Sequence, residues 1–234
     1  MDPQPANLIL QIQQKLQEHY GPLHWWPADH PFEVVVGAIL TQNTAWTNVE
    51  RAIDNLKHAD AMIPEMLAGM PIQQLEQLIR PAGFFRQKAH RLKFLAKHLV
   101  EEWQSDLAAF CGGPLDEARQ RLLTLTGIGP ETADSILLYA GGRPSFVVDA
   151  YTMRIFTRLG LLHGTEKYAE VRQLFMLNVP ADAQVYNEYH AQIVSLAKNI
   201  CRKKQPLCED CPLKTLCHYA HQTAASVRQG SPVA

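Results

Sequence analysis

The sequence carries almost no net charge. Its 22 lysines and arginines nearly balance 23 aspartates and glutamates, which leaves a formal charge of −1 at pH 7 with the histidines neutral. A balanced chain has no long-range field that attracts nucleic acid, so any nucleic-acid surface would have to be local. Basic residues gather in two places, and either group is also typical of a solvated helix face. They are Arg86, Lys88, His90, Arg91, Lys93, Lys97 and His98 in the first group, and Arg202, Lys203 and Lys204 in the second.

The sequence also has no long apolar run and no secretory leader. No segment approaches the roughly 20 apolar residues that a membrane-spanning helix needs. The first residues lack a basic segment followed by an apolar one, which is the signature of a signal peptide. We therefore expect a soluble cytoplasmic protein with no membrane partner.

Strand patterns and repeats are absent too, and the sequence shows helical spacing instead. Apolar residues recur at intervals of three and four, while prolines and glycines separate the segments. The predicted helices contain residues 8–16, 34–40, 49–56, 75–79, 89–100, 118–123, 136–139, 153–159, 171–177 and 186–200. We expect an all-α fold in which 234 residues, 47% of them hydrophobic, form one large core or two smaller ones. The polar tail 221–234 is expected to be disordered.

Four of the five cysteines lie close together in residues 201–217, here called the cysteine segment. Their spacing is C-x6-C-x2-C-x5-C, formed by Cys201, Cys208, Cys211 and Cys217. Four thiolates can hold either one [4Fe-4S] cluster or one Zn²⁺. Because a single pair forms the short knuckle typical of zinc sites, the spacing favours the larger iron–sulfur cluster, with zinc or two disulfides as alternatives. Cys111, far from the others, is expected to be an inert core residue.

A second motif, L-T-G-I-G-P-E-T-A-D, places Gly127 and Gly129 between two amphipathic segments. Two glycines allow a hairpin whose backbone can approach another molecule closely. Pro130 suits the first position of the next helix, whose exposed amides and positive end could bind a phosphate. An ordinary connection between two helices is the alternative.

These motifs, followed by V-V-D-A-Y around Asp149 and by R-L-G, resemble in order and spacing the helix-hairpin-helix DNA glycosylases of the endonuclease III superfamily. The resemblance covers residues 5–220 and includes the iron–sulfur loop at 201–217. It implies a six-helix barrel at 30–142, with the hairpin at 116–140, and a second lobe formed by 1–29 and 143–220 that carries a [4Fe-4S] cluster. It also implies a monomer, associated with the nucleoid, that binds double-stranded DNA and flips a damaged base into the cleft between the lobes.

The resemblance assigns the chemistry to Asp149. Breaking an N-glycosidic bond builds positive charge on the sugar, which a carboxylate stabilises while it orients the attacking water. The alternative is that Asp149 caps the helix that follows it. Bifunctional members of the family carry a catalytic lysine eighteen residues earlier, where this chain has Glu131. Without that amine no Schiff base forms, so we expect a monofunctional enzyme, in which Glu131 is most simply an acid in the first turn of a helix.

Four further runs resemble 3-methyladenine DNA glycosylase III, a monofunctional group within the superfamily. They are H-W-W-P at 24–27, P-F-E-V-V-V-G-A-I-L-T-Q-N-T-A-W at 31–46, R-P-A-G-F-F-R-Q-K-A at 80–89 and G-I-G-P-E-T-A-D at 127–134. The resemblance places Trp25, Trp26, Pro27 and Trp46 at the base pocket, where electron-rich rings favour a cationic alkylated purine. Packing in the core is the alternative for the tryptophans. The best-known form of this group lacks the iron–sulfur loop, which leaves the damaged base open.

The resemblance also assigns the contacts with DNA. Gln42 and Asn43 occupy the wedge position, where polar side chains fill the gap left by a flipped base, although a plain helix terminus is the alternative. The residues expected to contact phosphates are Gly127, Gly129, Thr132, Arg86, Lys88, Arg202, Lys203 and Lys204. Two other functions stay open: a bifunctional glycosylase and abasic-site lyase that borrows Lys198 or Lys203, and a non-catalytic DNA-damage binder with a redox cluster.

Overall fold

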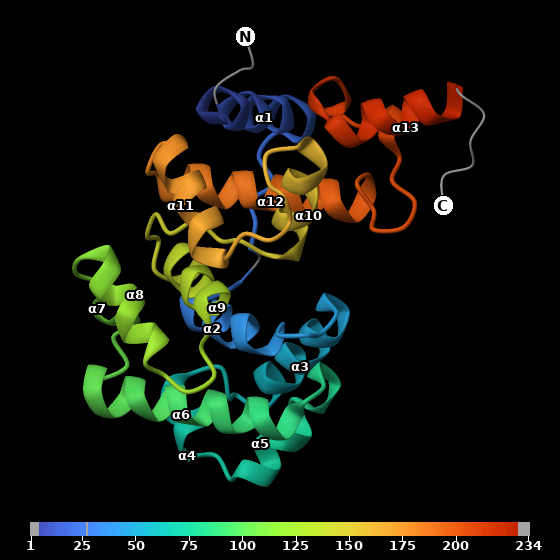
Figure 1. Cartoon of the computed structure of the whole chain (residues 1–234). Coiled ribbons are helices and arrows are strands. Elements are labelled where there is room, and N and C mark those ends of the chain that lie inside the picture. Colours follow the sequence, from blue (N-terminus) through green and yellow to red (C-terminus); the bar gives the residue numbers. More distant parts are fainter. Residues whose placement is uncertain (1–4, 27, 229–234) are drawn as a thin grey trace. The chain divides into compact units, whose positions relative to one another are not determined.

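The computed structural model describes residues 5–26 and 28–228, and every regular element in that part of the chain is a helix (Figure 1). The predicted all-α fold is therefore confirmed. None of the helices described is both long and apolar enough to cross a membrane. The chain divides into two compact units, one formed by Met1–Trp25 with Phe146–Ala234 and the other by Trp26–Ser145. The lobe ranges given by the resemblance stay a prediction.

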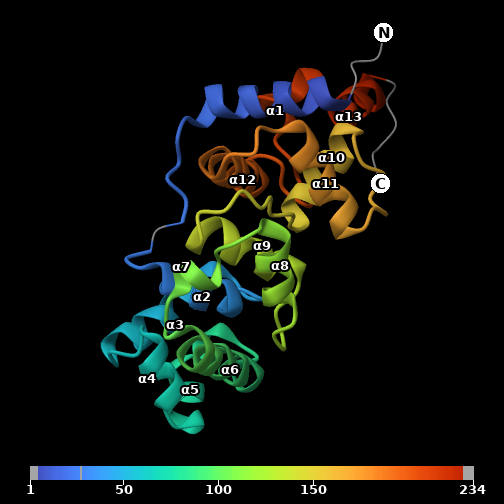
Figure 2. The same ribbon diagram turned by 90° about the vertical axis from the view of Figure 1, so that its left-hand side faces the viewer.

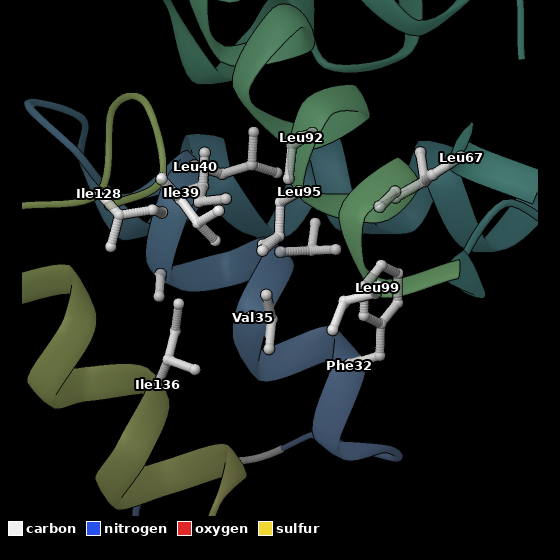
Figure 3. Close-up of a cluster of buried hydrophobic side chains, with 14 of the residues drawn as sticks. Phe32, Val35, Ile39, Leu40, Leu67, Leu92, Leu95, Leu99, Ile128 and Ile136 are labelled. Carbon is white, nitrogen blue, oxygen red and sulfur yellow. The ribbon is translucent and has the colours of Figure 1, made fainter. Parts of the chain in front are cut away.

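The unit Trp26–Ser145 is built around α2 (Pro31–Leu40). Every residue from Phe32 to Leu40 is buried, as expected of a helix that is apolar on nearly all sides. The one charged residue among them, Glu33, pairs with Lys57 at 2.9 Å. Side chains of α2 and of α6 (Phe85–Trp103) point into one hydrophobic cluster (Figure 3). The other elements of this unit are α3 (Trp46–His58), α4 (Pro64–Gly69), α5 (Ile72–Leu78), the 3-10 turn η1 (Arg80–Ala82), α7 (Leu107–Phe110), α8 (Leu115–Leu123), α9 (Pro130–Ser135) and the π-helical turn η2 (Ile136–Ala140).

The other unit has an aromatic core. The rings of Phe146 and Phe175 stack with their centroids 4.1 Å apart, and Tyr189 meets Phe146 edge-on. The hydroxyl of Tyr189 donates to the carbonyl oxygen of Ile9 at 3.1 Å, which holds α12 (Ala183–Asn199) against α1 (Pro5–Tyr20) (Figure 2). The remaining elements of this unit are α10 (Ala150–Leu159), α11 (Tyr168–Asn178), the 3-10 turns η3 (Cys208–Asp210) and η4 (Lys214–Leu216), and α13 (His218–Arg228).

The end of this unit is helical where the sequence predicts a disordered tail. α13 continues from His218 to Arg228 and packs against α10. Ala220 is buried, and the guanidinium of Arg158 lies 4.9 Å from the ring centroid of Tyr219. These contacts anchor the first turn of the helix, so the prediction is wrong for residues 221–228. Residues 229–234 lie outside the described part of the chain.

Truncating a core residue of α2 should destabilise its unit strongly. Ile39 is fully buried in the cluster of Figure 3, so Ile39→Ala should lower the free energy of unfolding by about 2–5 kcal/mol. The matched control is Ile63→Ala, because Ile63 is 49% exposed and its loss should cost less than about 1 kcal/mol. Urea unfolding followed by circular dichroism measures both losses. Equal losses would contradict the position of α2 at the centre of the core.

Candidate active site and nucleic-acid interface

Asp149 stands at the start of α10 and caps it. Its backbone is extended, and one carboxylate oxygen, Oδ1, accepts hydrogen bonds from the amide and the hydroxyl of Thr152 at 2.7 and 3.0 Å. Capping was one of the two roles that the sequence offered for this residue, and the structure contains it. The cap uses Oδ1, which leaves the second oxygen to face another element.

That second oxygen, Oδ2, faces His190 of α12. Nε2 of His190 lies 3.6 Å from it, and the two side chains are 8% and 15% exposed, with histidine the more buried. Burial acts to raise the pKa of Asp149, but hydrogen bonding and charge from His190, together with the hydrogen bonds from Thr152, outweigh it. The net effect holds the pKa of Asp149 below its ordinary value of 3.8. The carboxylate is therefore ionised at neutral pH.

Two arginines anchor α10 to the cysteine segment. Arg154 donates from Nε to the carbonyl oxygen of Cys201 at 3.1 Å. Arg158, one turn further on, donates to the Sγ of Cys201 at 3.1 Å and to the carbonyl oxygen of Arg202 at 2.8 Å. The helix that Asp149 caps thus holds the backbone and one sulfur of the segment.

The four cysteines of the segment line one hollow. Its wall consists of Arg158, Ile200, Cys201, Pro206, Leu207, Cys208, Cys211, Cys217, Tyr219 and Ala220. All four are free thiols in this structure, as is the buried Cys111. Burial raises the pKa of Cys211 to about 11 and also raises the pKa of Cys208 and Cys217. Burial therefore disfavours the thiolate form of these three sulfurs unless a cation lies beside them.

The donor set fits a thiolate-bound cluster. A bound metal would reverse these shifts and deprotonate the thiols. Arg158 already donates to one sulfur, and the hydroxyl of Tyr20, which senses the charge of Cys211, is buried without a hydrogen-bond partner in the described structure. Sulfur acceptors would satisfy such donors. Within residues 5–26 and 28–228, no three or more His, Cys, Asp or Glu side chains gather closely enough to hold a single metal ion.

The predicted hairpin joins α8 to α9. Gly127 has φ +85°, and a Cβ there would fall 2.3 Å from Nε of Arg91, so this position requires glycine. A Cβ on Gly129 would meet no atom within 4 Å, which leaves its exposed backbone open to another molecule. Below the turn, Arg119 of α8 grips the fully buried Asp134 of α9 through bonds of 2.9 and 3.1 Å. The two helices beside the turn are thus joined by an ion pair, while the backbone at Gly129 is left uncovered.

The first turn of α9 divides the two polar residues that the sequence singled out there. Glu131, at the position of the family's lysine, is exposed. Thr132 is only 7% exposed, and its hydroxyl accepts a hydrogen bond from Nε2 of Gln42 at 3.0 Å. The hydroxyl of Thr132 is thus used inside the protein, and a phosphate contact of Thr132 stays a prediction for its backbone alone.

Gln42 connects the hairpin to the turn that follows α2, residues 41–44. Its Nε2 donates to the carbonyl oxygen of Gly127 at 3.1 Å as well as to Thr132, and its Oε1 accepts from Arg91. Through these three bonds Gln42 links the two turns, and its wedge role stays a prediction. Asn43 differs, since it is exposed and left-handed at φ +53°.

Lys88 is buried and cannot reach a phosphate. The residue is 1% exposed, and its ammonium donates to the carbonyl oxygens of Leu40 and Ala82 and to the hydroxyl of Thr44, each at 2.8 Å. Desolvation, and then the charge of Arg91, lower the pKa of Lys88 to about 8. The predicted phosphate contact is wrong for this residue, because all three ammonium hydrogens are used within the protein.

The turn at residues 80–84 presents an aromatic ring that the sequence analysis missed. Phe84 is 65% exposed and left-handed at φ +45°. The residue that follows it, Phe85, has the guanidinium groups of Arg80 and Arg86 each 5.9 Å from its ring centroid. Arg86 itself is exposed, as a phosphate contact requires. The run G-F-F was the available signal, because two adjacent aromatic residues after a glycine turn can leave one ring exposed.

Three half-buried aromatic rings meet in the unit Trp26–Ser145. Trp26 packs edge-on against Trp46 with centroids 5.3 Å apart and at a tilt against Tyr139 at 5.1 Å. Its ring covers Gly37 of α2, where a Cβ would fall 3.0 Å from the indole. Tyr139 lies in η2, within the helix predicted at 136–139, but its contact with Trp26 is non-local and no spacing in the sequence points to it.

The other two predicted pocket residues do not belong to this group. Trp25 is part of the other unit, where Nζ of Lys198 lies 5.4 Å from its ring centroid. Pro27 lies outside the described residues. The structure therefore brings together two of the predicted aromatic residues and adds a third.

The basic residues of the cysteine segment are on the surface. Arg202, Lys203 and Lys204 are all exposed. The carbonyl oxygens of Arg202 and Lys203 accept hydrogen bonds from Arg158 at 2.8 and 2.9 Å, which fixes the backbone beneath the charged side chains. Their contact with phosphates stays a prediction.

Comparison with known proteins identifies the family. The family model for the HhH-GPD superfamily of base excision DNA repair proteins matches residues 36–181. A Methanocaldococcus jannaschii protein that bears the provisional name DNA repair glycosylase is 49% identical over 212 residues, which cover 90% of this chain and 96% of that protein. Endonuclease III of Thermotoga maritima is 30% identical over 198 residues, or 83% of this chain and 87% of its own.

Solved structures share the fold. An endonuclease III trapped as a covalent intermediate with DNA has a TM-score of 0.81 at 23% identity and covers 94% of this chain and 98% of its own. The 3-methyladenine DNA glycosylase of H. pylori, bound to 1,N6-ethenoadenine, has a TM-score of 0.71 at 30% identity, with coverages of 84% and 98%. The chain thus belongs to the HhH-GPD superfamily and is a base excision repair DNA glycosylase of the endonuclease III type.

Proposed function

We propose that the protein is a monofunctional DNA glycosylase that releases a cationic alkylated purine, such as 3-methyladenine, from duplex DNA. The observation that carries this proposal is the carboxylate of Asp149. It is kept ionised, with Oδ1 fixed in the helix cap and Oδ2 beside His190. A fixed anion of low exposure stabilises developing positive charge without reorganising in the transition state.

The chemistry needs such an anion at the sugar. When the N-glycosidic bond breaks, its electron pair goes to the alkylated ring, whose positive charge it neutralises, and the sugar becomes an oxocarbenium ion. Asp149 stabilises this ion and orients the water that adds to C1′, accepting the proton that the water loses. Because a cationic base leaves readily, positioning supplies much of the remaining rate.

Glu131 supports a single hydrolytic step. A lyase reaction requires an amine that attacks C1′ and forms a Schiff base. The position that holds this lysine in bifunctional relatives carries an exposed carboxylate here, in the first turn of α9. The positive end of the helix stabilises a carboxylate at this position, and a carboxylate offers no nucleophilic nitrogen.

The aromatic group of Trp26, Trp46 and Tyr139 supports a cationic substrate. Electron-rich indole faces attract a positively charged ring by about 0.5–2 kcal/mol more than a neutral one. The H. pylori structure, at 30% identity, was solved with 1,N6-ethenoadenine bound. A modified purine is thus the substrate class we assign to this chain.

We further propose that the exposed turns of the unit Trp26–Ser145 engage the duplex. Asn43 and Phe84 are its wedge, since a polar group and an exposed ring fill and stack within the gap left by a flipped base. The open backbone at Gly129 receives a phosphate, and Arg86, with Arg202, Lys203 and Lys204 of the cysteine segment, contacts others. Phosphate contacts of this kind position the protein without reading sequence.

The cysteine segment is proposed to hold a [4Fe-4S] cluster through Cys201, Cys208, Cys211 and Cys217. When bound, the cluster supplies four iron–sulfur bonds that organise a loop with little core of its own. Arg158 neutralises part of the thiolate charge and ties the segment to α10. The segment's part in repair is thus to present its basic residues.

Removing the charge of Asp149 should abolish base release without unfolding the protein. Asn caps a helix about as well as Asp, so Asp149→Asn should keep the fold while the single-turnover rate on methylated duplex DNA falls about 10²–10⁴-fold. Asp182→Asn is the matched control, because Asp182 caps α12 by accepting from the amide of Val185 at 2.9 Å. A variant at Asp149 with the wild-type rate would overturn the proposed role.

Restoring the lysine should create a lyase. The wild-type protein should leave the abasic strand intact and should not be trapped on DNA by borohydride, whereas Glu131→Lys should be trapped as a covalent complex. Glu131→Gln is the control, since it removes the charge without adding an amine. Trapping of the wild type would point instead to the bifunctional alternative, with Lys198 or Lys203 as the nucleophile.

The aromatic group should select for charge on the base. Trp26→Ala should lower kcat/KM for 3-methyladenine about 3–30-fold and lower the slow release of a neutral base such as hypoxanthine by less. The loss of kcat/KM for 3-methyladenine in Trp26→Phe should be smaller than the loss in Trp26→Ala. An equal loss for both bases would show that Trp26 packs the unit and does not recognise the substrate.

A further inference from the structure

Helix α6 carries two cations, one helical turn apart, whose charged groups bond within the protein. Lys88 is almost fully buried, with three bonds of 2.8 Å from one ammonium. Arg91 is half-buried, and it donates to Gln42 while its side chain fills the space beneath Gly127. Neither takes part in the base chemistry proposed above.

The three acceptors of Lys88 belong to separate elements. Leu40 ends α2, Thr44 closes the 41–44 turn, and Ala82 ends η1. The hydroxyl of Thr44 also donates to the carbonyl oxygen of Ala82, so the two turns share a second bond. One ammonium therefore fixes the turn that presents Asn43 to the turn that presents Phe84.

Both presented residues have a left-handed backbone. Asn43 and Phe84 have φ values of +53° and +45°. Asparagine tolerates this region, whereas a bulky aromatic residue such as Phe84 adopts it at a cost of roughly 1–2 kcal/mol and only where the surroundings impose it. Phe84 is 65% exposed, so its own packing does not hold it there. The bonds of Lys88 supply the restraint.

Arg91 adds the third turn. It holds Oε1 of Gln42, whose Nε2 donates to the carbonyl oxygen of Gly127 and the hydroxyl of Thr132. The 41–44 turn is thereby joined to the hairpin as well as to the 80–84 turn. Three surface turns that are distant in the sequence are therefore joined through hydrogen bonds of two side chains of α6.

A buried ammonium is a costly way to stabilise a fold. Desolvation opposes the charged form, and the cost is offset only because the ammonium bonds three acceptors that its removal would leave without this donor. The charge of Arg91 also opposes the charged form. From α2, the 41–44 turn and η1, the groups that face Lys88 are two carbonyls and a hydroxyl, with no carboxylate bonded to it. What the ammonium provides in return is a fixed geometry among three acceptors.

We propose that Lys88 and Arg91 are positioning residues that lock the 41–44 turn, the 80–84 turn and the hairpin into one rigid surface for DNA. The inference rests on the proposed function, because it assigns these turns to the duplex. Neither cation touches DNA in this account. Their loss should weaken binding of the duplex and raise KM, while kcat, which depends on Asp149 in the other unit, should change little.

The experiment compares Lys88→Met with Lys15→Met, which removes the same charge from α1. Each variant is titrated with a duplex that carries a non-cleavable abasic analogue, and its kcat and KM are measured on methylated DNA. Lys88→Met should raise the Kd and the KM about 10–100-fold and leave kcat within about threefold, whereas Lys15→Met should match the wild type. A Kd for Lys88→Met equal to that of Lys15→Met would overturn the proposal.

A second pair of variants keeps the test decisive if Lys88→Met does not fold. Thr44→Val removes one acceptor of the ammonium, while Thr44→Ser keeps the hydroxyl. We expect Thr44→Val to weaken DNA binding and Thr44→Ser to restore it, and equal binding by the two would also overturn the proposal. A wild-type protein that binds duplex DNA but releases no base would refute the proposed function and leave the Kd comparison standing.

The pH dependence gives an independent signature. The pKa of Lys88 is lowered to about 8 in the folded protein, and a neutral amine has two hydrogens for three acceptors. DNA affinity should therefore fall as the pH rises through about 8. Linkage requires the opposite trend for stability, since the unfolded chain binds the extra proton between that value and about 10.4. Lys88→Met should lack both steps, and a wild-type-like fall in its affinity would contradict the assignment.

Discussion

The start of α10 depends on the two carboxylate oxygens of Asp149, which make different contacts. Oδ1 of Asp149 caps α10 through Thr152, and Oδ2 lies beside His190 of α12. Because Oδ1 is bonded in the cap and Oδ2 faces His190, the orientation of the carboxylate is fixed. The group is therefore ionised and in place before substrate binds. The opposite end of the same helix holds the cysteine segment through Arg158. The capping of α10 and the placement of the carboxylate of Asp149 are therefore coupled.

In the unit Trp26–Ser145, hydrogen bonds of buried side chains join surface turns to one another. Its core around α2 is apolar, yet the ammonium of Lys88 is buried beside it. A buried cation is retained there beside exposed residues in strained conformations. Strain and buried charge in one place are the mark of a surface built for a partner rather than for stability. We infer that this unit trades folding free energy for a fixed set of turns.

Much of this could be predicted from the sequence, because the relevant signals are local. Helical periodicity predicted the all-α fold, the two glycines predicted the hairpin, and the helix cap at Asp149, one of the two roles considered for that residue, is present. The predictions that failed concern contacts between residues that are far apart in the sequence. Lys88 sits in a basic stretch that is typical of a solvated face, and its burial depends on carbonyls of Leu40 and Ala82 that no spacing reveals. His190 is brought to Asp149 by the packing of α12, so it carries no local signal either.

The central claim is that an ionised aspartate, without a lysine, releases a cationic base by hydrolysis alone. The most direct measurement is to incubate the protein with methylated duplex DNA and to analyse the free bases and the strands together. The account predicts free 3-methyladenine in the supernatant and, at each site, an abasic strand that stays unbroken until alkali is added. Strand cleavage that keeps pace with base release, or no release of 3-methyladenine, would contradict it.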